Sequence, residues 1–380
     1  MISDLYILIY NFLEKFTLLG YFSFCLLATF ILIVLVYPRK KVLSVKLTEQ
    51  GGECKRLNNV DFLRILLTYV IVLHHEFQPL NIANEAHNSV EMFFVISGFM
   101  LVYNYKSEMG IMEFIKRKIV AFLPYLLLAD LLALCLFLEI DISNLFAGVF
   151  LYADTLLCNK FSVYAPSWFL VTLFWVLILY FSLMKIFSKK VCALIIGIIA
   201  FITWSGMSDM GFILSPNNHL PLLTNGQVRA LSCISVGYFI ALNYKQEKEA
   251  HPKVLHTLLE MGLLIGLGGC LFAQSYKLPI YLIMILFVFL LWSFIHQKGY
   301  ISYLLEKINW APFARYMLPI FMTHWVITML QQYGRLWTDY SSWVRLVLSL
   351  FCATLLGIVS YHVVQLGYYF QNIRDKKSCK

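Results

Sequence analysis

The residues best suited to chemistry lie on one apolar stretch, residues 60–77, which carries Asp61, Arg64, His74 and His75. Arg64 and His75 are eleven positions apart, which in a helix returns them to within about 20° of one face and roughly 16 Å apart along the axis. His74 would point about 80° away. The spacing predicts an interior stripe that joins a guanidinium to an imidazole. A snorkelling arginine and an interfacial histidine would fit the same spacing.

A second polar group opens the next apolar stretch, residues 90–105, at Glu91. Its carboxylate would start on the same side as His75, where it could orient the imidazole and raise its basicity, as in a general-base pair. The small residues Ser97 and Gly98 are also typical of close helix packing. Adjacent histidines on a helix diverge by about 100°, and no second ligand pair accompanies them, so we predict no metal site.

The composition indicates what must position these residues. The 380 residues are 60% hydrophobic and 13% charged, about half the charged fraction of an ordinary soluble domain, roughly 25%. Apolar runs such as 17–37 and 278–295 approach the ~20 residues that a helix needs to cross the hydrocarbon. We therefore predict an all-α, polytopic helical bundle in a lipid bilayer.

The apolar runs predict eleven spans, ten core transmembrane helices and one extra N-terminal helix. They cover 17–37, 60–77, 90–105, 119–138, 165–187, 191–206, 228–243, 254–274, 278–296, 312–330 and 343–368. The segment 145–157 is short and broken by Asp154, so we predict a half-helix there. The expected domains are an N-terminal helix with a basic linker (1–50), a helical domain (51–372) and a basic cytoplasmic tail (373–380).

The distribution of basic residues predicts the orientation, because Lys and Arg concentrate in cytoplasmic loops. If the spans alternate sides, one face holds 22 of the 30 Lys and Arg. We therefore expect the N-terminus outside and the C-terminus in the cytoplasm. The net charge is +9, but the basic residues lie between the spans and do not form a stripe on a folded domain. We therefore expect no nucleic-acid partner.

The two polar spans together resemble the integral membrane acyltransferase type 3 family. Its first core helix carries an Asp, an Arg and, with ten residues between, a His, which match Asp61, Arg64 and His75. Its next helix carries FFxxSGF, which matches residues 93–99 and includes Ser97, with Glu91 at the acidic position before it. The register selects His75 over His74.

Weaker likenesses follow later in the chain. The Trp-x-Leu at Trp168, the segment 228–242 and the segment 320–324, which ends at His324, are each similar to family motifs. Many members carry Arg-x-x-Arg before the third core helix, but here Lys118 and Ala121 hold those positions. The neighbouring Lys116 and Arg117 could still supply charge. Acidic residues that follow Trp-x-Leu in some members are absent, which favours a distinct substrate subgroup.

The resemblance implies an O-acyltransferase of a bacterial inner membrane. It would move a short acyl group, usually acetyl, from cytoplasmic acetyl-CoA to a hydroxyl of a surface or lipid-linked carbohydrate, with no permanently bound cofactor. His75 would be the general base or accept the acyl group, supported by Glu91. The residues expected to bind donor or acceptor are Arg64, Asp61, Ser97, Lys116, Arg117, Lys118, Trp168 and His324.

Two other classes of protein would also place an arginine and a histidine in one membrane helix. A transporter or flippase could use Arg64 and His75 as a relay, but such proteins commonly show internal repeats, and the sequence shows none. A polymerase or ligase of polyprenyl-linked sugars would be expected to have long outward loops, and the longest loops predicted here are about twenty residues.

Overall fold

The computed structural model describes residues 56–77, 84–137, 166–209, 223–245, 251–272, 280–332, 337 and 340–378. This part of the chain is helical and contains no β-strand. Each of the ten predicted core spans coincides with one or more of its helices. The predicted N-terminal span 17–37 and the predicted half-helix 145–157 lie outside the described residues.

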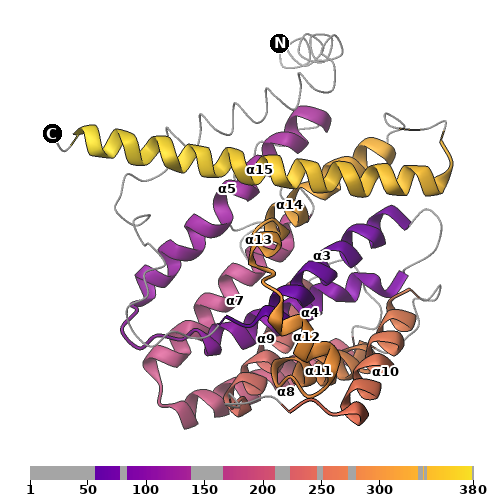
Figure 1. The fold of residues 1–380 in the computed structure, drawn as a ribbon. Coiled ribbons are helices and arrows are strands. Elements are labelled where there is room, and N and C mark those ends of the chain that lie inside the picture. Colours follow the sequence, from indigo (N-terminus) through magenta and orange to yellow (C-terminus); the bar gives the residue numbers. More distant parts are fainter. Residues whose placement is uncertain are drawn as a thin grey trace.

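The helices form one bundle with α3 among its inner members (Figure 1). Their bounds are α3 Asn58–Phe77, η3 Asn84–Asn88, α4 Ser89–Tyr103, α5 Ile111–Phe137, α7 Ser167–Ile186, α8 Lys189–Asp209, α9 Asn225–Asn243, α10 Val254–Leu271, α11 Ile280–Ile295, α12 Tyr300–Lys307, α13 Ala311–Ala314, α14 Met317–Gln332 and α15 Ser342–Ser378. Helix α15 runs across the bundle as its longest described helix (Figure 1). It outlasts the predicted span 343–368, so most of the predicted tail continues this helix.

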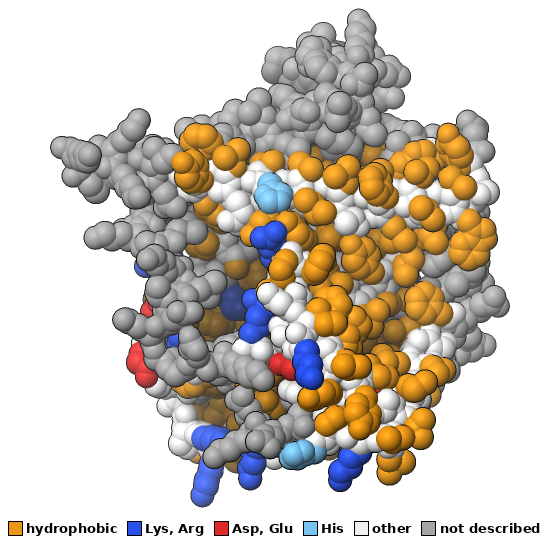
Figure 2. Space-filling model, in the orientation of Figure 1, with side chains coloured by type: hydrophobic (Ala, Val, Ile, Leu, Met, Phe, Trp, Pro, Cys, Tyr) orange, Lys and Arg blue, Asp and Glu red, His pale blue; other side chains and the backbone are white. Residues whose placement is uncertain are grey.

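The outer helices carry their apolar side chains outward. On α8 the side chain of Phe201 is 79% exposed, and on α10 that of Leu255 is 76% exposed. Figure 2 shows such hydrophobic side chains covering much of one face of the molecule. Water would not tolerate this surface, whereas lipid tails would, so the exterior is that of a multi-pass membrane protein.

Helix length and hydropathy separate the helices into two groups. Within the described residues, α7, α8, α10 and α15 contain segments long and apolar enough to cross a membrane, and α11 with α12 would add a fifth span bent by 59°. Helices α4 and α14 have only 15 and 16 residues, and α3 carries Asp61, Arg64 and Glu76. Length and hydropathy therefore support several membrane crossings among the described residues, but not the full predicted set of ten.

Helices α4 and α9 pack with their backbones in contact. A Cβ atom added at Gly98 would overlap the carbonyl oxygen of Ile234, and one added at Gly237 would overlap that of Val95. Each glycine therefore makes room for the partner helix, as small residues do between membrane helices. The packing role predicted for Gly98 is confirmed.

The turn between α11 and α12 is built around a buried carboxylate, Glu260 of α10. Its oxygens accept hydrogen bonds from the hydroxyls of Ser293 (2.8 Å) and Ser302 (2.6 Å) and from the backbone N–H groups of Gly299 (3.0 Å) and Ser302 (3.1 Å). Four donors satisfy a charge that would otherwise be costly to bury. The carboxylate fixes the start of α12.

Helix α12 in turn fixes the start of α3. The carboxylate of Glu306 accepts a hydrogen bond from the backbone N–H of Asn59 (2.9 Å), and the Asn58 amide donates to the Glu306 carbonyl (2.7 Å). The first N–H groups of a helix have no partner within the helix, so an outside acceptor stabilises that end. The first turn of α3, which carries Asp61, is held in this way.

Candidate active site

His75 lies near the end of α3 and faces α14. Its ring stacks on that of His324 with centroids 5.3 Å apart and meets Trp325 edge-on at 4.6 Å. Its Nδ1 atom is buried and has no hydrogen-bond partner. The imidazole therefore points into the bundle, as the predicted stripe requires, and one of its nitrogens is available to another molecule.

His74 points elsewhere. Its ring lies 5.7 Å from that of His87 in η3, while the ring of its neighbour His75 stacks on His324 of α14. Successive residues on a helix diverge by about 100°, so the two histidines contact different elements. The structure thus separates them in the way that the helix register predicts.

His324 is fully buried on α14. Its Nδ1 lies 2.7 Å from the carbonyl oxygen of Phe321, and a carbonyl can only accept, so Nδ1 carries the hydrogen. In the neutral ring the Nε2 atom is then an acceptor, and it has no partner. The stacked pair of His75 and His324, here called the histidine pair, presents two buried nitrogens without a hydrogen bond.

The other end of α3 is basic. Asp61 accepts hydrogen bonds from Arg56 (2.6 Å) and Arg64 (3.3 Å), and the side chain of Arg64 is 38% exposed. Lys118 of α5 lies close enough to Arg64 for their charges to repel, with its ammonium over the rings of Phe114 and Phe122. Asp61 therefore pairs with two cations, Lys118 adds a third beside Arg64, and the positive excess favours an anion.

Glu91 differs from the sequence-based expectation. Its Oε1 forms an ion pair with Arg229 of α9 rather than a contact with His75, and both side chains are largely buried. In the part of the chain that the structure describes, no hydrogen bond joins Glu91 to His75, so the carboxylate has a different partner from the predicted one. The close α4–α9 packing brings a full positive charge within reach, and a guanidinium binds a buried carboxylate more strongly than a neutral imidazole does.

Trp168 belongs to the same group as this ion pair. The guanidinium of Arg229 lies over its ring, 4.9 Å from the centroid. Arg229 sits near the start of α9, where Thr224 and Gln227 form a reciprocal capping box that fixes the first turn. We call Glu91, Arg229 and Trp168 the arginine centre. Arg229 was not among the predicted site residues, although its place at the edge of an apolar span was a signal that could have identified it.

An aromatic cluster links the two centres. Phe169 lies 5.0 Å from Phe321 and 6.2 Å from Phe93 between ring centroids, and Phe321 lies 5.8 Å from His324. On the other side, Phe94 contacts both Phe169 (4.9 Å) and Trp168 (6.4 Å). In the interior of the bundle, a layer of phenylalanine rings therefore separates the histidine pair from the arginine centre.

The remaining predicted site residues lie apart from the histidine pair. Ser97 is half-buried on α4, next to the glycine contact with α9. Lys116 is exposed, and Arg117 pairs with Glu113 one turn earlier (2.6 Å). These two basic residues belong to the start of α5 on the same helix as Lys118, so they contribute charge near the basic end rather than contacts at the imidazoles.

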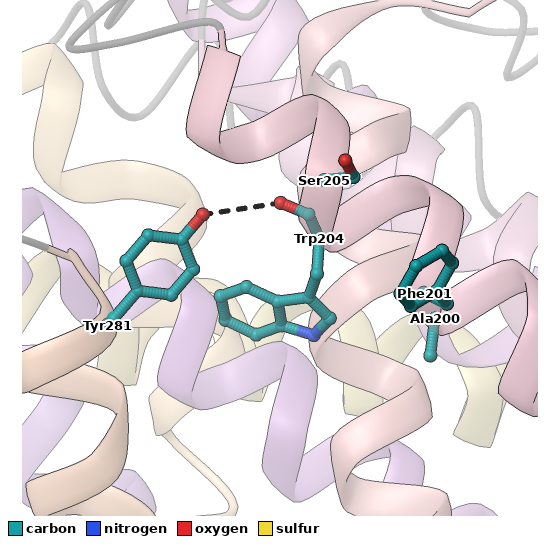
Figure 3. A pocket seen from close by; sticks show the side chains of 5 residues that line it. All are labelled: Ala200, Phe201, Trp204, Ser205 and Tyr281. Carbon is teal, nitrogen blue, oxygen red and sulfur yellow. Dashed lines mark hydrogen bonds between the residues drawn. The ribbon is translucent and has the colours of Figure 1, made fainter.

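A shallow apolar recess lies between α8 and α11 (Figure 3). It is lined by Ala200, Phe201, Trp204, Ser205 and Tyr281, and the Tyr281 hydroxyl donates to the Trp204 carbonyl (3.3 Å). None of the predicted site residues lines it. Its outward-facing aromatic wall fits the lipid-exposed surface better than a catalytic centre.

The described chain is a helical membrane protein with a histidine pair in its interior and a basic end on the same helix. Residues 57–362 match a family model described as an acyltransferase domain, which is more than three quarters of the 380 residues. The chain belongs to the acyltransferase type 3 family, and this family indicates a membrane acyltransferase. No curated protein and no solved structure matches the chain.

Proposed function

We propose that the protein is an O-acyltransferase that moves an acyl group, most simply acetyl, from cytoplasmic acyl-CoA to a hydroxyl of a surface or lipid-linked carbohydrate. The observation that supports this most directly is the histidine pair, because its rings stack between α3 and α14 and each ring has one buried nitrogen without a hydrogen-bond partner. His75 shares its helix with Arg64, roughly 16 Å away along the axis. A charged donor and a neutral acceptor could therefore meet at His75 from opposite ends.

The reaction requires one base and one attack. His75 takes the proton of the carbohydrate hydroxyl while the oxygen attacks the thioester carbonyl carbon. The carbon–sulfur bond breaks, and the proton on His75 passes to the departing CoA sulfur. The products are an ester and free CoA, and His75 returns to its neutral form. General-base catalysis of this kind contributes about 10²–10⁴ in rate.

His324 completes the proposal as a hydrogen-bond acceptor. Its Nδ1–H is held by Phe321, so Nε2 can accept a hydrogen bond from a neighbouring hydroxyl of the carbohydrate and thereby hold the attacking hydroxyl beside His75. An acyl-imidazole intermediate on His75 is the other route. We favour the base because direct transfer needs no second chemical step.

The basic end of α3 suits the phosphates of the donor. Arg64 and Lys118 carry the positive excess, Asp61 holds Arg64 in place, and Lys116 and Arg117 raise the local potential around them. Trp168 is proposed to contact the acceptor. One face of its ring is covered by Arg229, so the acceptor would use the other face or the ring edge.

Acetyl transfer by the purified protein tests the proposal. Protein in lipid nanodiscs is given radiolabelled acetyl-CoA and a glycan extract, and the labelled product is counted for wild type, His75→Ala and His74→Ala. We expect His75→Ala to lose transfer and His74→Ala to keep it, because His75 is the histidine whose ring stacks on His324 of α14. Equal loss in the two variants, or no labelled glycan with wild type, would contradict the proposal and favour a relay or a purely structural role.

A further inference from the structure

Arg315 is a basic side chain that the reaction described above does not use. It follows α13, is exposed, and its guanidinium lies over two rings, Tyr316 at 4.7 Å and Tyr361 of α15 at 5.5 Å. It donates a hydrogen bond to the Tyr316 hydroxyl (2.7 Å). Across the described ranges, no carboxylate forms an ion pair with it.

The two tyrosines are themselves fixed. Their rings meet edge to face at 5.1 Å, and the Tyr316 hydroxyl lies 3.4 Å from Nε2 of His362. A guanidinium held by stacking and one hydrogen bond loses little further freedom when it binds, and its remaining N–H groups form a fork suited to phosphate oxygens. Arg315 is thus ordered before any ligand arrives.

Arg315 belongs to the part of the bundle that packs against α3. Helix α13 packs on α3, where Trp310, just before α13, contacts Phe62 (5.1 Å). The same end of α3 carries Arg64, whose positive excess over Asp61 was described above. Figure 2 shows Lys and Arg side chains in a file that passes from below α15, over α13, to α12, beside a hollow with further basic side chains.

We propose that Arg315 binds a phosphate of the nucleotide portion of acyl-CoA, as a second anion site beside Arg64 and Lys118. The inference rests on the proposed function, because it assumes an acyl-CoA donor. If the thioester reaches His75, the pantetheine arm follows α3 and the phosphates are left at the basic end, where Arg315 is an unneutralised and ordered cation. Arg315 is then a specificity residue for the nucleotide, with no contact to the reacting atoms.

Initial-rate kinetics with two donors test this role. Acetyl-CoA carries the nucleotide phosphates and acetyl-pantetheine does not. For Arg315→Gln we expect KM for acetyl-CoA to rise roughly tenfold with little change in kcat, the loss of one charge-assisted hydrogen bond, and KM for acetyl-pantetheine to stay the same. Arg315→Lys should fall between wild type and Arg315→Gln, because it keeps the charge and loses the fork.

A matched control is available on the neighbouring helix. Lys307 is also exposed and lies 4.1 Å above the ring of Tyr303, so Lys307→Gln removes a similar cation–aromatic pair from the same region. It should leave both KM values unchanged. An unchanged KM for acetyl-CoA in Arg315→Gln, an equal rise with both donors, or an equal rise in Lys307→Gln would overturn the inference.

A binding measurement separates this inference from the proposed function. Calorimetric titration with free CoA needs no acceptor and no turnover, so it reports on Arg315 even if wild type transfers no acetyl group. We expect Arg315→Gln to weaken CoA binding about tenfold, in nanodiscs with or without anionic lipid. A difference that disappears when anionic lipid is omitted would assign Arg315 to a lipid headgroup and refute the nucleotide site.

Discussion

The histidine pair and the arginine centre are two buried polar groups on either side of one phenylalanine layer, and they treat their ionisable residues differently. In the arginine centre, Glu91 and Arg229 neutralise each other and join α4 to α9. In the histidine pair, the rings of His75 and His324 are in contact, but each ring has one buried nitrogen without a hydrogen-bond partner. Two sites with the same sequence signal, an ionisable residue in an apolar helix, thus have different uses.

The two centres differ in whether their buried polar groups have hydrogen-bond and charge partners. A buried ion pair holds two helices together, because losing either partner leaves an uncompensated charge. A buried imidazole nitrogen without a partner contributes nothing to the packing of its helices and is costly to keep. The arginine centre therefore suits an anchor, and the histidine pair suits catalysis. Substitutions in the histidine pair should therefore change the reaction rate, and substitutions in the arginine centre should change the stability of the fold.

The largest expected effect is on rate, at His75. His75→Gln should lower acyl transfer by about 10²–10⁴, the contribution of a general base, while the midpoint of thermal unfolding stays near that of wild type because no hydrogen bond of Nδ1 is lost. Initial rates and a melting curve on the same preparation measure both quantities. A fall in rate matched by a large fall in melting temperature would remove the distinction between the two centres.

The next effect is on stability, at Arg229. Arg229→Met should lower the free energy of unfolding by about 3–5 kcal/mol, because Glu91 is then buried without its partner. The double variant Arg229→Met, Glu91→Leu should recover much of this loss. Unfolding titrations in mixed micelles give the values. If the double variant is no more stable than the single one, Glu91 and Arg229 do not act as a pair.

A smaller loss of stability is expected at the contact that brings the arginine centre together. Gly98→Ala should cost about 1–3 kcal/mol, because the added methyl group overlaps the Ile234 carbonyl and forces α4 and α9 apart. The same unfolding titration measures it. Gly262→Ala on α10, where nothing lies within 4 Å of an added Cβ, is the control and should not be destabilising.

The smallest expected effect concerns His324. His324→Asn keeps a donor for the Phe321 carbonyl but removes the Nε2 acceptor, so we expect a loss of roughly tenfold in kcat, the worth of one neutral hydrogen bond. His324→Gln keeps a polar atom near the Nε2 position and should lose less. Steady-state kinetics would show this order, and the reverse order would indicate that the hydrogen bond to Phe321 is what matters.

The site could be predicted from the sequence where it depends on a single helix. The spacing of Arg64 and His75 is local, so helix geometry places them without knowledge of the fold. The partner of Glu91 is not local, since Arg229 is 138 positions away. It meets Glu91 only because Gly98 and Gly237 let the backbones of α4 and α9 touch. The spacing of residues along the sequence does not predict which two helices will pack in this way.

Hydropathy predicted where the helices lie along the chain, but not which of them are inside the bundle and which face the lipid. The long apolar segments of α8 and α10 are only 17% and 22% buried, because their apolar faces are turned to lipid. The helices with the polar chemistry, α3, α4 and α14, are shorter or more polar and lie inside. The short helices α12 and α13 were not predicted either, because each is too short to give a periodic pattern.

The buried Glu260 carboxylate makes the turn between α11 and α12 rigid. The carboxylate cannot rotate or leave without breaking four hydrogen bonds, so this turn does not act as a hinge. Through Glu306, helix α12 also holds the first turn of α3 in place. Helix α12 is therefore a fixed element beside the basic end of α3, and any movement that admits acyl-CoA or releases CoA must come from the segments that face it.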